Sequence, residues 1–407
     1  MGHSENFSKI TSGIQSFITL PVSPGEGRRR VRECRHLRKG DSEMGAENGH
    51  KGKRGGRSDH FLLTAVGDVF LPGTVRFVDG KILSSNEDLG KTVFDKVAPY
   101  FQKSDVNFCN LESALSNKGN PQAGRYAAFR SFPSMIEVLK KGKIDFVSVA
   151  NNHTLDYGWE ALSDTLDLLR QNGIGFSGAG RNIEEARKPA LVEKKGLTVG
   201  LLSYTANVNT PFGFKASEER EGLAPIRISP FFQPDHTNQE DVEAMQSDVR
   251  QWKFQVDFLV VSFHWGISEG GTHTVALHQK VIGHHAVNAG ADLVLGHHSH
   301  ALQAVEIYRN KPICFGLGNF VFALEEGFPR ETMLLQCQIS RHKVHEIFFL
   351  PAYVSKQGQP EVVSPEQGHG LEIVSLMRSL CSRFGTKVIT LKQAEEVILK
   401  GKRLAKK

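Results

Sequence analysis

The chain has 407 residues, of which 39% are hydrophobic and 9% aromatic, and this composition predicts a soluble globular protein with a sizeable core. The formal net charge of +6 would suit a nucleic-acid-binding protein, but the segment from Glu26 to Arg57 alone holds 11 Lys and Arg against 5 Asp and Glu, a surplus equal to that of the whole chain. The remainder is therefore neutral by this count, and we expect no nucleic-acid partner for it.

Residues 1–58 are predicted to form a disordered basic tail. The basic segment is rich in Gly and Ser and nearly free of large apolar residues, so it cannot bury enough surface to offset the entropy lost on ordering. A role of this tail in targeting, or in binding nucleic acid or a membrane surface, stays open.

Cellular location is predicted from the apolar stretches and the cysteines. The first 20 residues lack the uninterrupted apolar core of a secretion signal, and stretches such as Phe258 to Phe263 are too short for a transmembrane segment. The five cysteines are widely spaced without a CxxC pair, which favours a reducing compartment over a disulfide framework. We therefore expect a cytoplasmic protein.

After Ser58, strand-like and helix-like segments alternate, which predicts an α/β layered fold with right-handed crossovers. Strands are predicted over 60–66, 144–150, 197–204, 258–263 and 292–295, with a hairpin of 303–308 and 312–315. Helices are predicted from Trp159 to a stop at Asn172-Gly173 and over 274–289. The segments predicted as loops are 217–251 and the chain after Pro351, up to a helix near 371–384. The lysine-rich end, 400–407, is expected to be frayed.

Residues of the types that commonly bind metals follow five strand-like segments. The residues are Asp68, Asn110-Leu111-Glu112, Asn151-Asn152-His153, His264 and Gly296 to His300. Because the carboxyl ends of strands in an open α/β sheet line the ligand crevice, we expect these side chains to converge.

A mixed set of Asp, Glu, Asn and His side chains is suited to a pair of divalent ions. His298 and His300 would share one face of an extended segment, and Glu112 could bridge two ions. Two such ions acidify a bound water and stabilise an oxyanion in the transition state.

Taken one at a time, most of these residues also have an ordinary explanation. Asp68 after a glycine, and Asn151 beside Asn152, are common turn residues, and His264 could be a buried histidine whose hydrogen bonds are satisfied within the fold. Three histidines between His297 and His300 seldom arise for packing alone. His273, His278, His284 and His285 lie in or near a predicted helix and are expected to be structural or surface residues.

Six segments occur in the order typical of the CapA/PgsA family of capsule and poly-γ-glutamate biosynthesis proteins, related to calcineurin-like metallophosphoesterases. They are Gly67 to Phe70, Asn110 to Glu112, Asn151 to Gly158, His264 to Gly266, Gly290 to His300 and Gly316 to Phe320. The resemblance runs from about Leu62 to Phe322.

The resemblance implies a four-layer metallophosphoesterase-like sandwich of two packed mixed sheets flanked by helices, with the metals at the loop ends. We expect this domain over 59–355 and a C-terminal loop and helical extension over 356–407. The implied metal-binding residues are Asp68, Glu112 as the bridging carboxylate, Asn152, His264, His298 and His300. The resemblance also implies that His153 protonates a leaving group, that Asp156 orients His153, and that Asn319 lines the pocket.

The sequence departs from the phosphoesterase pattern at the first metal. Those enzymes carry a histidine ligand two residues after the first Asp, where this chain has Phe70, and the bridging position is Glu112 rather than Asp. We therefore expect one firm Mn, Fe or Zn ion at Glu112, Asn152, His264 and His298, and a weaker one near Asp68 and His300.

Several functions remain open from the sequence. The first is poly-γ-glutamate biosynthesis or export with a metal-dependent hydrolase-type site, and the alternatives are a phosphoesterase acting on a small phosphoester and a non-catalytic subunit that binds the anionic polymer. A nuclease-like role is suggested only by the basic tail. Many CapA-like proteins are similar to membrane-tethered components of a polymer synthesis complex. This chain has a polar, basic segment at its start instead, so we expect that tethering needs a partner subunit or does not occur.

Overall fold

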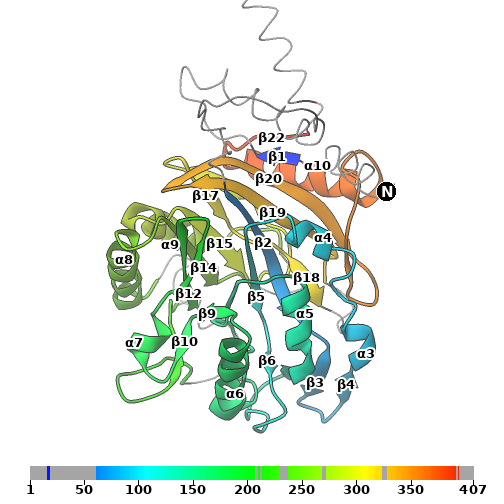
Figure 1. Ribbon diagram of the computed structural model, residues 1–407, viewed down its shortest axis with the longest axis vertical. Coiled ribbons are helices and arrows are strands. Elements are labelled where there is room, and N and C mark those ends of the chain that lie inside the picture. Colours follow the sequence, from blue (N-terminus) through cyan, green and yellow to red (C-terminus); the bar gives the residue numbers. More distant parts are fainter. Residues whose placement is uncertain are drawn as a thin grey trace, which may run out of the picture.

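The computed structural model describes residues 16–18, 61–206, 210, 213–228, 237–267, 272–322, 328–390 and 393. Two large mixed sheets dominate the fold, and Figure 1 shows helices on the outer side of each. Side chains of both sheets, such as Phe108 and Val260, belong to one buried cluster, so the sheets pack against each other. The predicted four-layer sandwich is thus confirmed.

The ten-stranded sheet has the order β22-β1-β20-β19-β2-β5-β8-β9, with β18 also paired to β2 and β21 to β20. Strands β2, β5, β8 and β9 are parallel neighbours, whereas β19 and β20 are antiparallel. The strands are β1 (Ser16–Ile18), β2 (Phe61–Phe70), β5 (Val106–Leu111), β8 (Phe146–Ser148), β9 (Gly175–Ser177), β18 (Asn319–Phe322), β19 (Glu331–Ser340), β20 (Lys343–Val354), β21 (Pro360–Val362) and β22 (Val388–Thr390).

The six-stranded sheet has the order β11-β12-β14-β15-β17-β16, with β12, β14, β15 and β17 parallel. Its strands are β11 (Ala190–Lys194), β12 (Leu197–Thr205), β14 (Phe258–His264), β15 (Leu293–His297), β16 (Val305–Tyr308) and β17 (Lys311–Cys314). The predicted hairpin is confirmed: Arg309 and Asn310, with φ of 49° and 61°, form its two-residue turn.

Helices cover the outer faces of both sheets. α8 and α9 pack on β14 and β15, and α4, α5 and α6 share a buried cluster with the outward-facing residues of β2 and β5 (Figure 1). The helices are α3 (Glu87–Gly90), α4 (Ala98–Phe101), η1 (Pro133–Met135), α5 (Ile136–Lys141), α6 (Gly158–Gln171), α7 (Ile183–Ala186), α8 (Gln239–Lys253), α9 (Leu277–Ala289) and α10 (Gly368–Ser382).

Two small sheets lie apart from the main ones. A four-stranded sheet of order β4-β3-β7-β6 consists of β3 (Gly73–Phe77), β4 (Ile82–Ser84), β6 (Ala114–Leu115) and β7 (Ala127–Ser131), and β10 (Ala179–Gly180) pairs with β13 (Gly222–Leu223). The four-stranded sheet inserts between the parallel strands of the ten-stranded sheet in chain order, so its loops lie near their carboxyl ends (Figure 1).

The prediction of a loop over 217–251 was wrong for its last part, where α8 forms. Asn238 caps this helix by accepting a hydrogen bond from the Asp241 amide at 3.0 Å. Val242, Met245 and Val249 supply a narrow apolar stripe that is buried against the six-stranded sheet. Three apolar positions at helical spacing suffice for docking although the rest of the segment is polar.

The chain after Pro351 is more regular than predicted. β20 continues to Val354, β21 follows, and α10 begins at Gly368, three residues before the predicted helix. Within the predicted basic tail, Ser16–Ile18 forms β1 between β20 and β22, and the basic segment from Glu26 to Arg57 lies outside the described residues.

Candidate metal centre

The carboxyl ends of parallel strands from both large sheets meet at one place. Asp68 lies near the end of β2, Glu112 directly follows β5, and Asn152 and His153 follow β8. His264 is the last residue of β14, and the residues that follow β15 are His298 and His300. All seven side chains are buried, and the ligand atoms of Asp68, Glu112, His264, His298 and His300 form two neighbouring groups at this edge.

Close backbone approach at this edge requires glycine. A Cβ atom on Gly67 would lie 1.9 Å from the carbonyl oxygen of Gly318, and one on Gly296 would lie 2.0 Å from that of Phe315. The amide of Asp68 donates a hydrogen bond to the Gly318 carbonyl at 2.9 Å. The glycines thereby bring the loop before β18 against the end of β2.

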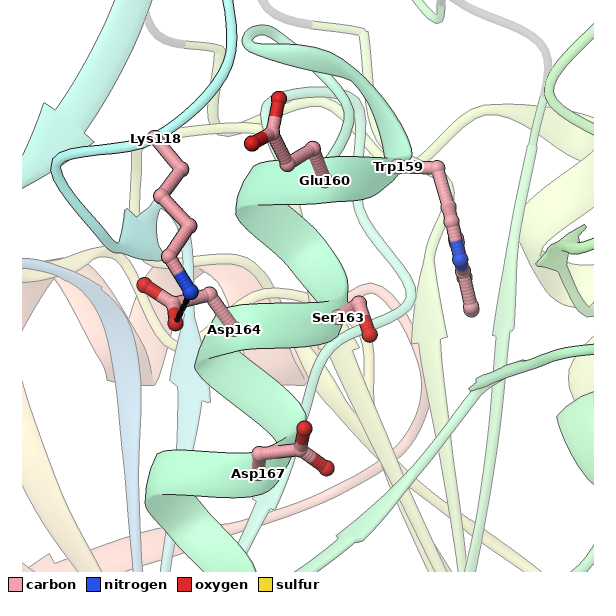
Figure 2. Close-up of a pocket in the computed structure, with 6 residues that line it drawn as sticks. All are labelled: Lys118, Trp159, Glu160, Ser163, Asp164 and Asp167. Carbon is pink, nitrogen blue, oxygen red and sulfur yellow. Dashed lines mark hydrogen bonds and ion pairs between the residues drawn. The ribbon is translucent and has the colours of Figure 1, made fainter.

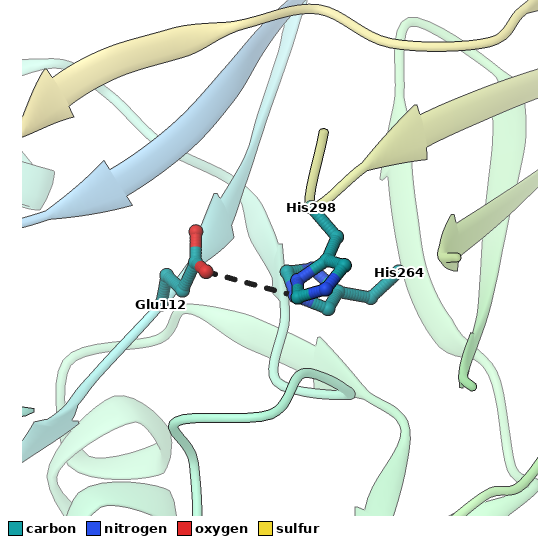
Figure 3. A group of neighbouring side chains, drawn as sticks. All are labelled: Glu112, His264 and His298. Carbon is teal, nitrogen blue, oxygen red and sulfur yellow. Dashed lines mark ion pairs between the residues drawn. The ribbon is translucent and has the colours of Figure 1, made fainter. Parts of the chain in front are cut away.

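Glu112, His264 and His298 form one group whose ligand atoms lie within 4.8 Å of one another. Figure 3 shows the Glu112 carboxylate facing the two imidazole rings, which come from separate strands. His264 Nε2 lies 3.6 Å from Glu112 Oε1 and 2.7 Å from Asn152 Oδ1, so the asparagine oxygen faces the same centre.

Asp68, Glu112 and His300 form a second group of the same size, which shares Glu112 with the first. His300 Nδ1 lies 2.8 Å from Asn319 Oδ1, and its Nε2 lies 3.8 Å from Glu112 Oε1. Asn319 is opposite Asp68 in the β18–β2 pair. A hydrogen bond from Nδ1 to Asn319 leaves the Nε2 lone pair facing Glu112.

The electrostatics of these groups suit a cation. Burial, with the charges of neighbouring histidines, lowers the pKa of His264 well below its usual value, and burial lowers that of His298 to about 3. Burial raises the pKa of the Asp68 carboxyl, but hydrogen bonding and charge from His297 outweigh this and hold it below the usual value. The histidines are thus neutral and Asp68 is ionised at neutral pH, as metal ligands must be.

His298 supplies an independent test of whether an ion fits. Its side chain is fully buried, yet neither ring nitrogen has a hydrogen-bond partner among the described residues. Leaving an imidazole buried without a partner is costly, and coordination of an ion by one of its nitrogens would offset that cost. The residues present therefore fit a divalent metal ion.

The prediction that His298 and His300 lie in an extended segment was wrong. Their φ angles are 81° and 51°, in the left-handed region, because the chain bends immediately after β15. Such backbone is strained for residues other than glycine and tends to persist where function requires it. Both rings still reach the site, with centroids 5.8 Å apart.

His153 lies beside the two groups in a fixed orientation. Its Nδ1 is 2.6 Å from Asp156 Oδ2, and its ring stacks on Phe129 at a centroid distance of 3.9 Å and an angle of 2°. Asp156 is fully buried and also accepts a hydrogen bond from the Phe129 amide at 2.7 Å. The arrangement leaves Nε2 of His153 as the nitrogen available to a substrate.

Three residues of the site received no role from the sequence: Asn110 and His297 stand within predicted segments, and Arg125 was missed. Asn110 donates to Asp68 Oδ1 at 2.9 Å, and His297 Nδ1 lies 3.0 Å from the same oxygen. Asn110 is two residues before Glu112, so strand alternation could have placed both on one face. Arg125, which pairs with Asp156 at 2.7 Å, comes from a loop that carries no recognisable signal.

Phe70 is buried where the phosphoesterase pattern has a ligand. Its ring stacks on Phe129 at 4.8 Å and contacts Phe322 edge-on at 5.7 Å, and Phe322 in turn lies 5.0 Å from the His300 ring. Aromatic side chains thus form the wall of the centre on the Asp68 side.

A separate hollow of about 420 Å³ lies on α6 and is lined by Lys118, Trp159, Glu160, Ser163, Asp164 and Asp167. Figure 2 shows Lys118 paired with Asp164, at 2.6 Å, while Trp159 lies away from the carboxylates. None of the predicted site residues lines this acidic hollow, and it does not suit an anionic ligand.

Comparison with known proteins places these residues in a family context. The family model of the bacterial capsule synthesis protein PGA_cap matches residues 62–324. The PGA biosynthesis protein CapA of Bacillus subtilis is 28% identical over 288 residues, covering 70% of each chain. A probable polyglutamine synthesis accessory protein of Mycobacterium tuberculosis is 28% identical over 295 residues, covering 70% of this chain and 75% of the relative.

No helix within the described part of the chain is long and apolar enough to cross a membrane. The matched segment contains the end of every strand that contributes to the centre, from Asp68 to Asn319. The chain therefore belongs to the PGA_cap family of bacterial capsule synthesis proteins, as its resemblance to CapA/PgsA implied.

Proposed function

We propose that the protein takes part in the biosynthesis or export of a poly-γ-glutamate-type polymer and carries a metal-dependent hydrolase-type centre. The observation that supports this most directly is the pair of buried ligand groups that share Glu112, with the supported imidazole of His153 beside them. The names of the relatives, PGA biosynthesis protein and polyglutamine synthesis accessory protein, supply the polymer class.

The firm ion, Mn, Fe or Zn, would be held by Glu112, Asn152, His264 and His298. Asp68 and His300 would hold a weaker second ion, with Glu112 bridging and Asn319 orienting His300. When bound, the ions would supply Lewis-acid polarisation of the scissile group and of the attacking water. The surrounding side chains bury the reacting groups, and burial lowers the pKa of His264 and His298, which keeps these two imidazoles neutral.

His153 would act as the general acid. The Nδ1–H donates to Asp156, and in the imidazolium form Nε2 carries the second proton, which is delivered to the leaving group. For an amide-linked polymer, water adds to the carbonyl carbon and releases one proton to solvent, the C–N bond breaks, and the leaving nitrogen takes the proton from Nε2. His153 is then reprotonated from solvent. The stack on Phe129 limits rotation of the ring during this transfer.

Phe70 favours a second candidate function, a non-catalytic subunit that binds the anionic polymer within a synthesis complex. With Phe70 in place of a ligand, the Asp68 side of the centre has fewer metal ligands than a phosphoesterase has, and a single firmly bound cation would hold a carboxylate without turning it over. Hydrolysis of a small phosphoester is the other enzymatic alternative.

The deciding experiment combines metal analysis with turnover. Purified protein is expected to retain Mn, Fe or Zn and to cleave poly-γ-glutamate in a Mn²⁺-dependent manner, with a phosphodiester as the competing substrate. His153→Ala should keep the metal and lose turnover by roughly 10²- to 10⁴-fold, the usual contribution of a general acid. Metal binding without turnover on either substrate would instead support the binding subunit.

A further inference from the structure

Arg125 connects the proposed acid to the proposed metal ligands. It lies in the loop before β7, and its side chain is only 11% exposed. Its Nε forms an ion pair with Asp156 Oδ1 at 2.7 Å, and its Nη2 donates a hydrogen bond to the backbone carbonyl of Asn152 at 3.0 Å. One guanidinium therefore holds both the carboxylate that orients His153 and the peptide that joins Asn152 to His153.

The buried Asp156 carboxylate depends on several partners, of which Arg125 is the permanently charged one. Its side chain is fully buried, its Oδ1 forms an ion pair with Arg125, and its Oδ2 contacts His153 Nδ1 and accepts a hydrogen bond from the Phe129 amide. A buried carboxylate needs such donors to remain ionised. Among the described residues, Arg125 is the one that pairs with Oδ1, so its charge supports the ion pair with His153.

The same side chain limits movement of Asn152. The Asn152 Oδ1 atom lies 2.7 Å from His264 Nε2, at the centre of the proposed firm site. A shift of the Asn152 peptide would move this oxygen relative to Glu112, His264 and His298. A supporting hydrogen bond to the backbone of a metal ligand is the kind of contact on which metal affinity depends.

We propose that Arg125 is a positioning residue that couples the His153–Asp156 pair to the metal-binding asparagine. The proposal rests on the proposed function for the roles of His153 and Asn152. Lysine cannot reproduce the contacts, because a single ammonium group cannot reach Asp156 and the Asn152 carbonyl with the fork geometry of a guanidinium.

The test uses Arg125→Lys and Arg125→Ala in the full chain, with Arg130→Ala as a matched control. Arg130 lies five residues further on, and its guanidinium stacks on Tyr157 at 4.5 Å, next to Asp156. Co²⁺ affinity and the visible absorption spectrum of the bound Co²⁺ report the position of Asn152. The ¹⁵N NMR signals of His153 in the metal-free protein report its tautomer and its contact with Asp156.

Both Arg125 variants are expected to bind Co²⁺ roughly 10- to 100-fold more weakly, as for loss of other supporting contacts to ligands. Their Co²⁺ spectrum and the His153 signals should change, whereas Arg130→Ala should match the wild type. Should Arg125→Ala fail to fold, Arg125→Lys, which keeps the charge, gives the same readouts.

A folded Arg125→Lys protein with wild-type Co²⁺ affinity, Co²⁺ spectrum and His153 signals would overturn the proposal, even with a lowered melting temperature. That outcome would show a purely structural ion pair. Failure of the proposed function is distinguishable, since it would appear as absence of turnover or of metal binding in the wild-type protein, while the His153 signals still report on Arg125.

Discussion

His298 combines two features that are individually uncommon. Its backbone is in the left-handed region, with φ of 81°, and its buried imidazole lacks hydrogen-bond partners among the residues described. Each feature costs free energy in the absence of an ion. Because the imidazole is neutral, with a pKa of about 3, it needs no proton release to bind a metal near neutral pH.

The two histidines after β15 are expected to differ in their effect on metal content. His298→Ala should remove the firm ion, with a loss of affinity beyond the roughly 10- to 100-fold that a supporting residue contributes. His300→Ala should affect only the weaker ion, because His300 belongs to the Asp68 group. Titration with Mn²⁺ and elemental analysis check this. Equal loss in both variants would contradict the assignment of one firm and one weaker ion.

Phe70→His is expected to strengthen binding of the second ion. Position 70 is two residues from Asp68 on the same strand, so both side chains leave the same face, and an imidazole there adds a ligand type that suits the centre. The measurement is the Mn²⁺ stoichiometry and affinity of the variant.

Phe70→Leu is the control for this substitution, since it removes the ring that stacks on Phe129 without adding a ligand. If the second-ion affinity of Phe70→His equals that of Phe70→Leu, position 70 does not face the ion and the shortage of ligands has another cause.

At the scale of the elements, the same hydrogen-bonded aspartate recurs at the amino ends of the parallel strands. Four aspartates precede β5, β8, β14 and β15, and each accepts a hydrogen bond from a backbone amide at or next to the neighbouring strand. They are Asp105, Asp145, Asp257 and Asp292, bonded to the amides of Leu62, Asn107, Thr198 and Leu259 at 2.8 to 2.9 Å. Each also pairs with a lysine or arginine. These hydrogen bonds between aspartates and neighbouring strands fix strand register at the end opposite the metal centre.

The buried member of this set should matter most for stability. Asp292 is fully buried and pairs with Lys253 and Lys311, both at 2.6 Å, so Asp292→Ala leaves two partly buried ammonium groups without their carboxylate. We expect a loss of about 3–5 kcal/mol in the free energy of unfolding, measured by urea denaturation.

Asp257→Ala is the matched control, because its partner Arg341 is 73% exposed. It should cost about 1 kcal/mol, mainly from the hydrogen bond to the Thr198 amide, since an exposed ion pair contributes little. Equal losses of unfolding free energy for the two variants would show that the ion pairs of Asp292 add nothing beyond the hydrogen bond from a backbone amide that each aspartate accepts.

At the scale of the whole molecule, the proposed firm ion connects the two large sheets. Glu112 and Asn152 follow strands of the ten-stranded sheet, whereas His264 ends one strand of the six-stranded sheet and His298 directly follows another. A ligand that binds only the assembled sheets stabilises the folded state as a whole.

Metal is therefore expected to raise global stability. At a free Mn²⁺ concentration of about 100 times Kd, the free energy of unfolding should increase by about 2.7 kcal/mol, and EDTA should reverse the change. Thermal and urea denaturation check this, with His298→Ala as the control that should lose the shift. A shift that persists in His298→Ala would place the stabilising ion elsewhere.

The alternation of strand-like and helix-like segments in the sequence was sufficient to predict the main layers but not every element. Strands such as β14 and β15 are continuous apolar runs, which identify buried parallel strands. α8 was missed because its apolar stripe is narrow, and β1 could not be foreseen because its pairing with β20 joins residues more than 300 positions apart. Such long-range pairing leaves no local pattern.

The sequence by itself indicated most of the side chains that lie at the candidate centre. Polar residues directly after buried strands have to meet at the carboxyl edge of a parallel sheet, so Asp68, Glu112, His264 and His298 could be grouped without coordinates. Only the tertiary structure decided which atoms each of these side chains contacts. The bend after β15 separates His297, which contacts Asp68, from His298, and Arg125 reaches Asp156 from a distant loop. Left-handed backbone and contacts between distant loops depend on packing of the whole chain, which local periodicity does not encode.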